Sequence, residues 1–223
     1  MSTYEPNNVK NETAMNTVKA VAIMILAIGI ICFALVGIII GLLTFGVIGA
    51  KVEVHNDIAE YNDYIHNSSE EIYRRCSGEM FEIFPNTITG DMNVEEFQFM
   101  YYNPWDAQYI TYMKVDYNEN AYRDEIDRLQ GIGQGVYRGI YSVTDEPVGY
   151  DLVAIYPDEY QGFVYAMIPE GAGEDSTVII YVGISFCNYF LDVDIHDYLP
   201  NEYLLEGFDA TNDNPYRKLK MGE

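Results

Sequence analysis

Residues 20–50 constrain this chain more than any other feature, because thirty-one consecutive positions carry no charged side chain. As an α-helix the segment would be roughly 46 Å long, against a bilayer hydrocarbon core of about 30 Å. A core helix of a soluble protein would show a polar stripe, and this segment has none. The segment is therefore predicted to be a transmembrane helix that binds the lipid bilayer through residues 20–50.

The flanking residues bear on processing and orientation. A cleaved signal peptide is the weaker interpretation, because the apolar run is about twice as long as a secretory h-region and lacks a small residue three positions before Lys51. Lys10 and Lys19 precede the span, and only Lys51 follows it closely. The excess of positive charge on the N-terminal side predicts a single-pass cell-membrane protein with a short cytoplasmic N-terminus, residues 1–19, and its C-terminal domain outside.

Two glycines within the span suggest a second role for it. Gly37 and Gly41 form a GxxxG pair, with Ala34 one turn earlier. Small residues on one helix face let two membrane helices approach closely, so the pair predicts helix dimerisation and a homodimer. The alternative is that these glycines are incidental, because glycine is common in membrane helices.

The remainder of the chain is strongly acidic. The formal net charge is −23, and residues 51–223 hold ten Lys or Arg against thirty-three Asp or Glu. Such a surface repels phosphate backbones, so nucleic acid is excluded as a partner. Of the three cysteines, Cys32 lies in the span, and Cys76 and Cys187 are either bridged to each other or two free thiols.

Periodicity divides the region after the span into three parts. Apolar residues recur at helical spacing in residues 51–78, which predicts a helical stalk. Residues 79–205 switch to alternating strands and one clear helix, and residues 206–223 are polar and read as a C-terminal tail. The expected strands are 97–102, 109–117, 136–143, 150–156, 162–168 and 177–185.

The expected helix covers residues 118–130, with Asp116 or Asn118 as the N-cap and Gly131 just after the end. Its single apolar face predicts that it packs on a sheet, and the short connections between strands require antiparallel neighbours. The fold class is therefore α+β: an N-terminal transmembrane helix and helical stalk, then a mostly antiparallel β-sheet domain with one main helix on a face.

Four segments of the domain stand out together: Glu82–Pro85, Phe97–Tyr102, the helix positions Tyr122, Glu125, Ile126, Arg128 and Leu129, and the closing Tyr198, Leu199, Pro200 and Tyr203. In these residues the domain resembles a group of uncharacterised membrane-anchored or secreted domains of anaerobic Gram-positive bacteria. The group has no assigned activity. The resemblance therefore implies an extracytoplasmic setting and assigns no functional site.

Asp192, Asp194 and His196 form the main candidate for chemistry. Their spacing of two residues would direct all three side chains to one face of an extended chain, where two carboxylates and an imidazole could bind a divalent metal ion. The alternative is the polar face of an exposed edge strand, which is favoured because acids are abundant in this domain. The pattern leaves a membrane-tethered metal-dependent enzyme as one hypothesis.

Twenty tyrosines and Trp105 follow the span. Tyrosine combines a flat apolar face with a polar tip, which suits binding of a protein, peptide or cell-wall glycan, but tyrosine is also a favoured strand residue. No catalytic motif and no cofactor-binding motif is found. The sequence therefore favours a non-catalytic extracytoplasmic binding module over an enzyme, with the dimerising span as a structural alternative.

Overall fold

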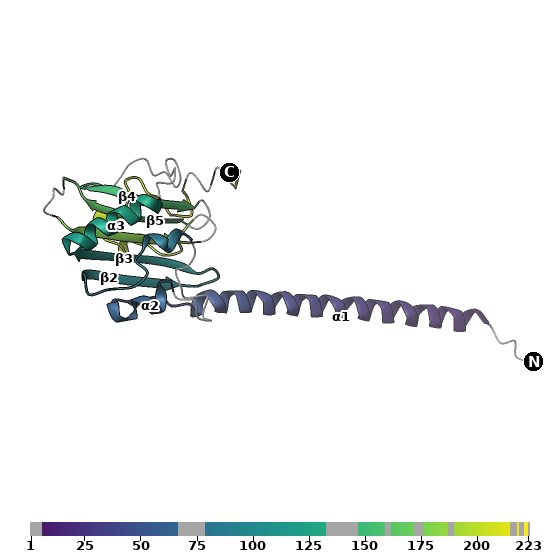
Figure 1. Cartoon of the computed structure of the whole chain (residues 1–223). Coiled ribbons are helices and arrows are strands. Elements are labelled where there is room, and N and C mark those ends of the chain that lie inside the picture. Colours follow the sequence, from purple (N-terminus) through teal and green to yellow (C-terminus); the bar gives the residue numbers. More distant parts are fainter. Residues whose placement is uncertain are drawn as a thin grey trace, which may run out of the picture. The chain divides into compact units, whose positions relative to one another are not determined.

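The computed structural model describes residues 6–66, 79–132, 147–158, 162–171, 176–186, 190–214, 218 and 221–222. The chain separates into two compact units, Met1–Gly49 and Ala50–Glu223 (Figure 1). The expected strand 136–143, and Cys76 and Cys187, lie outside the described residues. Cys32 is a free cysteine on the first unit.

The first unit is one long helix, α1 (Pro6–Gly49). It begins fourteen residues before the predicted span, so the expected N-terminal segment 1–19 is largely helical. Within the described residues, the window Met15–Leu42 is long and apolar enough to cross a membrane, although a signal sequence near the N-terminus would meet the same criterion. Its large side chains are exposed, Phe33 at 83%. The one hydroxyl described near its end, Thr44, donates to the Ile40 carbonyl at 2.8 Å, which satisfies it within the helix.

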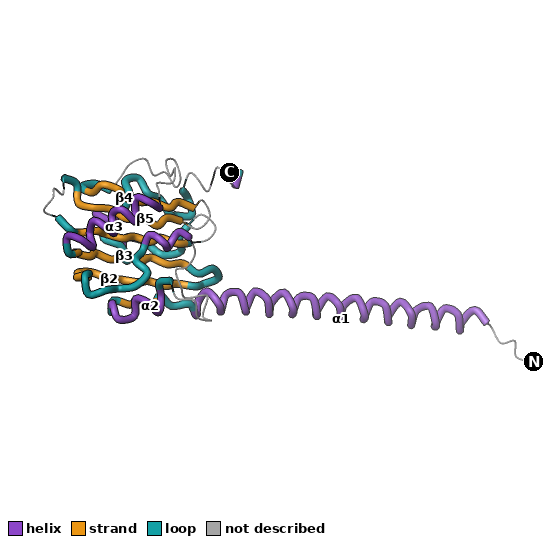
Figure 2. The backbone as a smooth tube through the Cα atoms, viewed as in Figure 1, coloured by secondary structure: helices purple, strands orange, loops and turns teal. Residues whose placement is uncertain are grey.

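The second unit is an α+β domain built on a six-stranded sheet (Figure 2). Every pairing in this sheet is antiparallel. The order across the sheet is β1-β2-β3-β6-β5-β4. The strands are β1 (Glu53–His55), β2 (Met92–Tyr102), β3 (Gln108–Tyr117), β4 (Tyr150–Asp158), β5 (Gly162–Pro169) and β6 (Val178–Ser185). Five of them overlap expected strands, although β2 begins five residues before the expected strand 97–102, and residues 103–107 connect β2 to β3.

One face of the sheet is covered by helical segments. The helix α3 (Glu119–Ile132) lies across it, and the 3-10 helix η3 (Glu79–Ile83) packs beside it on β4 and β5 (Figure 1). Asn118 is the N-cap, since its side-chain oxygen accepts from the Ala121 amide at 3.0 Å. The helix continues through Gly131, so the expected stop at that glycine is wrong.

The opposite face is covered by the C-terminal segment, which contains the 3-10 helices η5 (Ile195–Asp197) and η6 (Asn201–Tyr203). The predicted tail boundary at residue 206 is wrong for the part that the structure describes. Ala210 is 7% exposed and Asn214 is fully buried, and the Leu191 amide donates to the Ala210 carbonyl at 2.8 Å. The segment therefore belongs to the domain at least as far as residue 214.

The predicted helical stalk, residues 51–78, is also corrected where the structure describes it. Residues 53–66 form strand β1, the 3-10 helix η1 (Ile58–Glu60) and a single turn, α2 (Tyr61–Tyr64), all within the second unit. Tyr61 and Ile65 are each 1% exposed. Both side chains pack into the core beside the sheet; the rings of Tyr61 and Phe97, for example, have centroids 5.9 Å apart. The helical spacing of these residues therefore reflects their contacts with the core and does not indicate a continuous helical stalk. Residues 67–78 lie outside the described residues.

Candidate functional site

The predicted metal ligands do not lie on a strand. Asp194 is the N-cap of η5, where its carboxylate accepts from the His196 amide at 3.0 Å, and His196 Nδ1 lies 2.6 Å from the Asn201 side-chain oxygen. Asp192 instead binds the buried Gln108 of β3: its carboxylate accepts from the Gln108 amide group, and its backbone N–H donates back at 2.8 Å.

These three residues do line one open pocket of about 550 Å³, together with residues of the 208–212 turn. Lining the same pocket does not make them a ligand set, because a 3-10 turn replaces the extended chain that would have aligned their side chains. Among the described residues, no group of three or more His, Cys, Asp or Glu side chains could hold a metal ion. The contacts of Asp192, Asp194 and His196 instead attach the C-terminal segment to the sheet and shape its turns.

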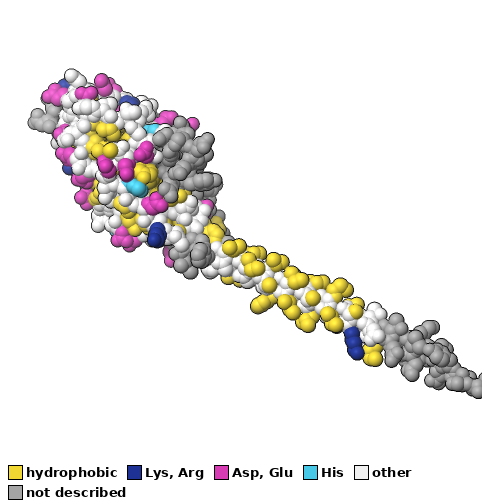
Figure 3. Space-filling view, turned by 90° about the horizontal axis from the view of Figure 1, so that it is seen from below, with side chains coloured by type: hydrophobic (Ala, Val, Ile, Leu, Met, Phe, Trp, Pro, Cys, Tyr) yellow, Lys and Arg dark blue, Asp and Glu magenta, His cyan; other side chains and the backbone are white. Residues whose placement is uncertain are grey.

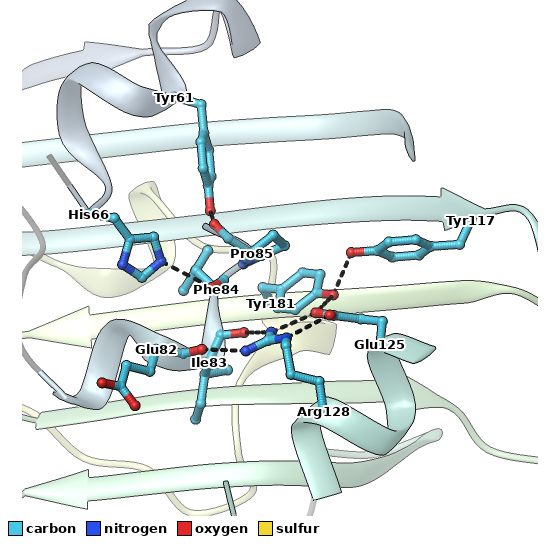
Figure 4. A network of polar contacts seen from close by, with 10 residues as sticks. All are labelled: Tyr61, His66, Glu82, Ile83, Phe84, Pro85, Tyr117, Glu125, Arg128 and Tyr181. Atoms are coloured by element: carbon cyan, nitrogen blue, oxygen red, sulfur yellow. Dashed lines mark hydrogen bonds and ion pairs between the residues drawn. The ribbon is translucent and has the colours of Figure 1, made fainter. Parts of the chain in front are cut away.

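A buried ionic network lies under α3 on the opposite face (Figure 4). Glu125, 9% exposed, receives two hydrogen bonds from Arg128, both 2.6 Å long, and a third of 2.6 Å from the Tyr181 hydroxyl. Tyr117 and Tyr181 bond to each other at 2.6 Å. Burial raises the pKa of both tyrosines, so each stays a neutral phenol at physiological pH. Burial disfavours the Arg128 cation, but the hydrogen bond and charge of Glu125 outweigh it and raise its pKa.

The same network secures the end of η3. Four consecutive backbone carbonyls, residues 82–85, each accept a side-chain hydrogen bond (Figure 4). Arg128 donates to the first two at 2.6 and 2.8 Å, His66 contacts the third at 3.0 Å, and Tyr61 donates to the fourth at 2.5 Å. A short helix leaves its last carbonyls without partners, and these side chains supply them. The network therefore stabilises the fold, because Glu125 and Arg128 are bonded to each other and Arg128 also holds the end of η3.

Three tyrosines form a second cluster, on the face that the C-terminal segment covers. The ring of Tyr203, on η6, meets Tyr112 of β3 edge-on at 5.7 Å and Tyr150 of β4 edge-on at 5.9 Å. Tyr203 is buried and held by the Tyr165 hydroxyl, which donates to its carbonyl at 2.6 Å. Tyr112 and Tyr150 are only half-buried. We call Tyr112, Tyr150 and Tyr203 the tyrosine cluster.

Charged side chains surround the tyrosine cluster. The Tyr203 hydroxyl donates to Glu96 at 3.3 Å, and Lys114 Nζ lies 2.8 Å from a Glu95 carboxylate oxygen and 4.0 Å from one of Glu96. Glu202 precedes Tyr203 and is exposed. Burial raises the pKa of all three clustered tyrosines, and the negative charges of Glu96 and Glu202 raise it further in each case. We call Glu95, Glu96 and Glu202 the acidic rim.

The rim belongs to a surface that is acidic as a whole. Asp and Glu side chains are spread over the face of the domain seen in Figure 3, and Lys and Arg are few. A second concavity, a groove of about 440 Å³, lies between α3 and β4, with Ile126 and Ile168 among its apolar lining and Asp127 and Asp151 among its polar lining. At the tyrosine cluster, half-buried aromatic rings and exposed carboxylates lie side by side on this surface.

The fold and the site together describe a protein with one apolar helix followed by an antiparallel α+β domain, which carries a partly exposed aromatic cluster. No protein-family model matches the chain, and no curated protein or solved structure matches it significantly. The resemblance to domains of anaerobic Gram-positive bacteria therefore stays an expectation.

Sequence reasoning identifies the excess of tyrosine but misses the cluster itself. Tyr112, Tyr150 and Tyr203 come from three elements that are far apart along the chain. Their only local signal is the alternation within each strand, which aims Tyr112 and Lys114 to one face of β3. Trp105, the other aromatic residue singled out, is 55% exposed in the turn between β2 and β3.

Proposed function

We propose that this chain is a single-pass membrane protein whose α+β domain is a non-catalytic binding module outside the cytoplasm, with a protein or peptide ligand at the tyrosine cluster. The observation that carries the proposal is the pair of half-buried rings, Tyr112 and Tyr150, which rest on the buried Tyr203. Rigid tyrosines at a wet surface offer contact area at little conformational cost, as they do in protein interfaces.

The chemistry of the other polar clusters supports a binding role over catalysis. Glu125 and Arg128 already satisfy each other and their neighbours under α3, the Asp192 carboxylate accepts from Gln108 of β3, and Asp194 and His196 make contacts within the C-terminal segment. A general base must reach a substrate proton, and the Glu125 carboxylate already accepts three hydrogen bonds from protein groups. The exposed apolar surface of α1 is stabilised best by lipid, which supports the anchor.

Site-specific photocrosslinking in intact cells tests the binding role. A photoreactive amino acid at position 150 is expected to give a discrete crosslinked product, and the same probe at Asp124, exposed on α3, serves as the control. The product at position 150 should be lost when Tyr112 is replaced by Ala. Equal products from both positions, or none from position 150, would contradict the proposal.

Fractionation tests the anchor and its orientation. We expect the full-length protein in the membrane pellet after alkaline washing, with its N-terminal residues retained and its domain cleaved by protease added to the outside of intact cells. Recovery of a soluble protein that starts after Gly49 would show instead that α1 is a signal sequence. Protection of the domain from external protease would reverse the orientation.

Pairing of the span through Gly37 and Gly41 is a separate proposal. A Cβ atom added at either glycine would meet nothing within 4 Å, so the groove that these glycines leave is uncovered in the single chain. Replacing both by Ile should abolish a crosslinked dimer formed through a cysteine introduced at Ala34, which lies one turn earlier on the same helix face, because the larger side chains keep the helices apart. An unchanged dimer yield would show that the glycines play no part.

A further inference from the structure

One cation, the Lys114 ammonium group, already lies beside the tyrosine cluster. Lys114 lies on β3 two residues from Tyr112, and its ammonium group is held by the Glu95 carboxylate, with Glu96 at 4.0 Å. The hydrogen bond to Glu95 is the main cause that raises the pKa of Lys114, so the side chain stays charged. One ammonium group therefore balances one of the three carboxylates of the acidic rim.

We propose that the tyrosine cluster and its acidic rim bind Lys or Arg side chains of a basic peptide segment in a partner protein. This inference rests on the proposed binding function and names the ligand chemistry of that same site. The aromatic faces of Tyr112 and Tyr150 supply cation–π contacts, and Glu96 and Glu202 supply the opposite charge.

Charge complementarity is the first argument for a basic ligand. The chain carries a formal net charge of −23, so an approaching basic segment is attracted from a distance while acidic partners are repelled. The field is also negative locally, because Glu96 and Glu202 act on all three tyrosines of the cluster. A neutral ligand would gain nothing from this field.

The mix of aromatic and acidic groups is the second argument. An exposed carboxylate by itself holds a cation weakly in water, and an aromatic face adds a second attraction when the cation lies over it. In the cluster the two kinds of group come from four elements, with Glu96 on β2, Tyr112 on β3, Tyr150 on β4 and Glu202 on η6. A lysine or arginine chain can lay its methylene stem on the rings and place its charged head at the rim.

The experiment uses the full-length protein in neutral detergent micelles with a short lysine homopeptide as the probe. Binding is measured by calorimetry at several salt concentrations, with a glutamate homopeptide and a neutral oligosaccharide as comparison probes. We expect binding of the lysine probe alone, weakened by salt. The double variant Glu96→Gln with Glu202→Gln should bind about tenfold more weakly.

A charge-matched control distinguishes binding at the tyrosine cluster from general attraction by the net negative charge of the protein. The double variant Asp124→Asn with Asp127→Asn removes the same charge from α3, on the opposite face of the sheet, and should bind within about twofold of the natural chain. Tyr150→Leu removes a ring without changing charge and should weaken binding severalfold, whereas Tyr150→Phe keeps the ring and should preserve it. Unaltered folding of each variant is checked by the cooperativity of its unfolding.

Four outcomes would overturn the inference. An equal loss in both double variants would mean that the probe senses only net charge. Full binding by Tyr150→Leu would remove the role of the aromatic ring, and tighter binding of the neutral oligosaccharide would make the ligand a glycan. If crosslinking at position 150 still captures a partner while the lysine probe fails to bind, only the basic ligand is wrong; if both fail, the proposed binding function is wrong as well.

Discussion

The two faces of the sheet use the same residue types for different ends. Under α3, the hydroxyls of the buried Tyr117 and Tyr181 bond to each other, Tyr181 donates to Glu125, and each of these side-chain oxygens has a protein partner. On the other face Tyr112 and Tyr150 are half-buried, and their carboxylate neighbours Glu96 and Glu202 reach water. Both groups contain tyrosine and glutamate, so residue type does not distinguish them. They differ in whether each polar atom already has a partner within the protein, which leaves only the second group able to bind a ligand.

The largest loss of stability is expected when the buried network under α3 is disrupted. Glu125→Ala leaves the Arg128 guanidinium and the Tyr181 hydroxyl without their shared acceptor, and removing one partner of a buried ion pair costs about 3–5 kcal/mol. We expect the free energy of unfolding of the full-length protein in detergent, measured with urea, to fall by about that amount. Asp124→Ala, one residue away and exposed, is the control and should change it by less than about 0.5 kcal/mol. Equal effects would mean that the network is not closed.

A smaller effect compares hydroxyl groups on the two faces directly. Tyr181→Phe removes a hydrogen bond to a charged acceptor and should cost about 2 kcal/mol, whereas Tyr165→Phe removes a bond to the neutral Tyr203 carbonyl and should cost about 1 kcal/mol. Both hydroxyls are fully buried, so burial is matched. The same urea titration checks both values, and a reversed order would show that the charge of Glu125 does not strengthen its hydrogen bond with Tyr181.

The third effect is a pH dependence of the free energy of unfolding, which arises from His66 in the network under α3. Burial is the main cause that lowers the pKa of His66 below 6.5, so below about pH 6.5 the unfolded chain binds a proton that the folded chain resists. Stability is therefore fully present above that pH and falls as the pH drops towards the lowered pKa. His66→Gln should reduce the loss of unfolding free energy between about pH 7 and pH 5. An identical pH profile for the variant would exclude His66 as a contributor.

Sequence reasoning reaches the parts of this fold that depend on local pattern. The apolar helix follows from a long run of residues without charge, and five strands and the main helix each follow from periodicity within one segment. Asn118 is one of the two residues that the pattern predicts as the helix cap. The errors arise where tertiary packing reuses a local pattern. Tyr61 and Ile65 have helical spacing but serve the sheet core, and Asp192, Asp194 and His196 have strand spacing but lie in turns.

The candidate site is beyond the reach of sequence reasoning for a related cause. Tyr112, Tyr150 and Tyr203 are brought together by the strand order β3-β6-β5-β4 and by the return of the C-terminal segment over the sheet. Non-consecutive neighbours of this kind leave no trace in the periodicity of any one strand. The acidic rim is equally hidden, because its residues are three among thirty-five acids.

The smallest change in stability is expected at the acidic rim, on the face of the sheet that the C-terminal segment covers. Glu96 and Glu202 reach solvent, and exposed carboxylates near the surface change stability little, so Glu96→Gln with Glu202→Gln should shift the unfolding free energy by less than about 1 kcal/mol. Tyr203 would lose only a long hydrogen bond of 3.3 Å to Glu96. The same urea titration measures this change beside Glu125→Ala. A loss as large as that of Glu125→Ala would show that the rim is a second closed network, which would leave no carboxylate available for a ligand.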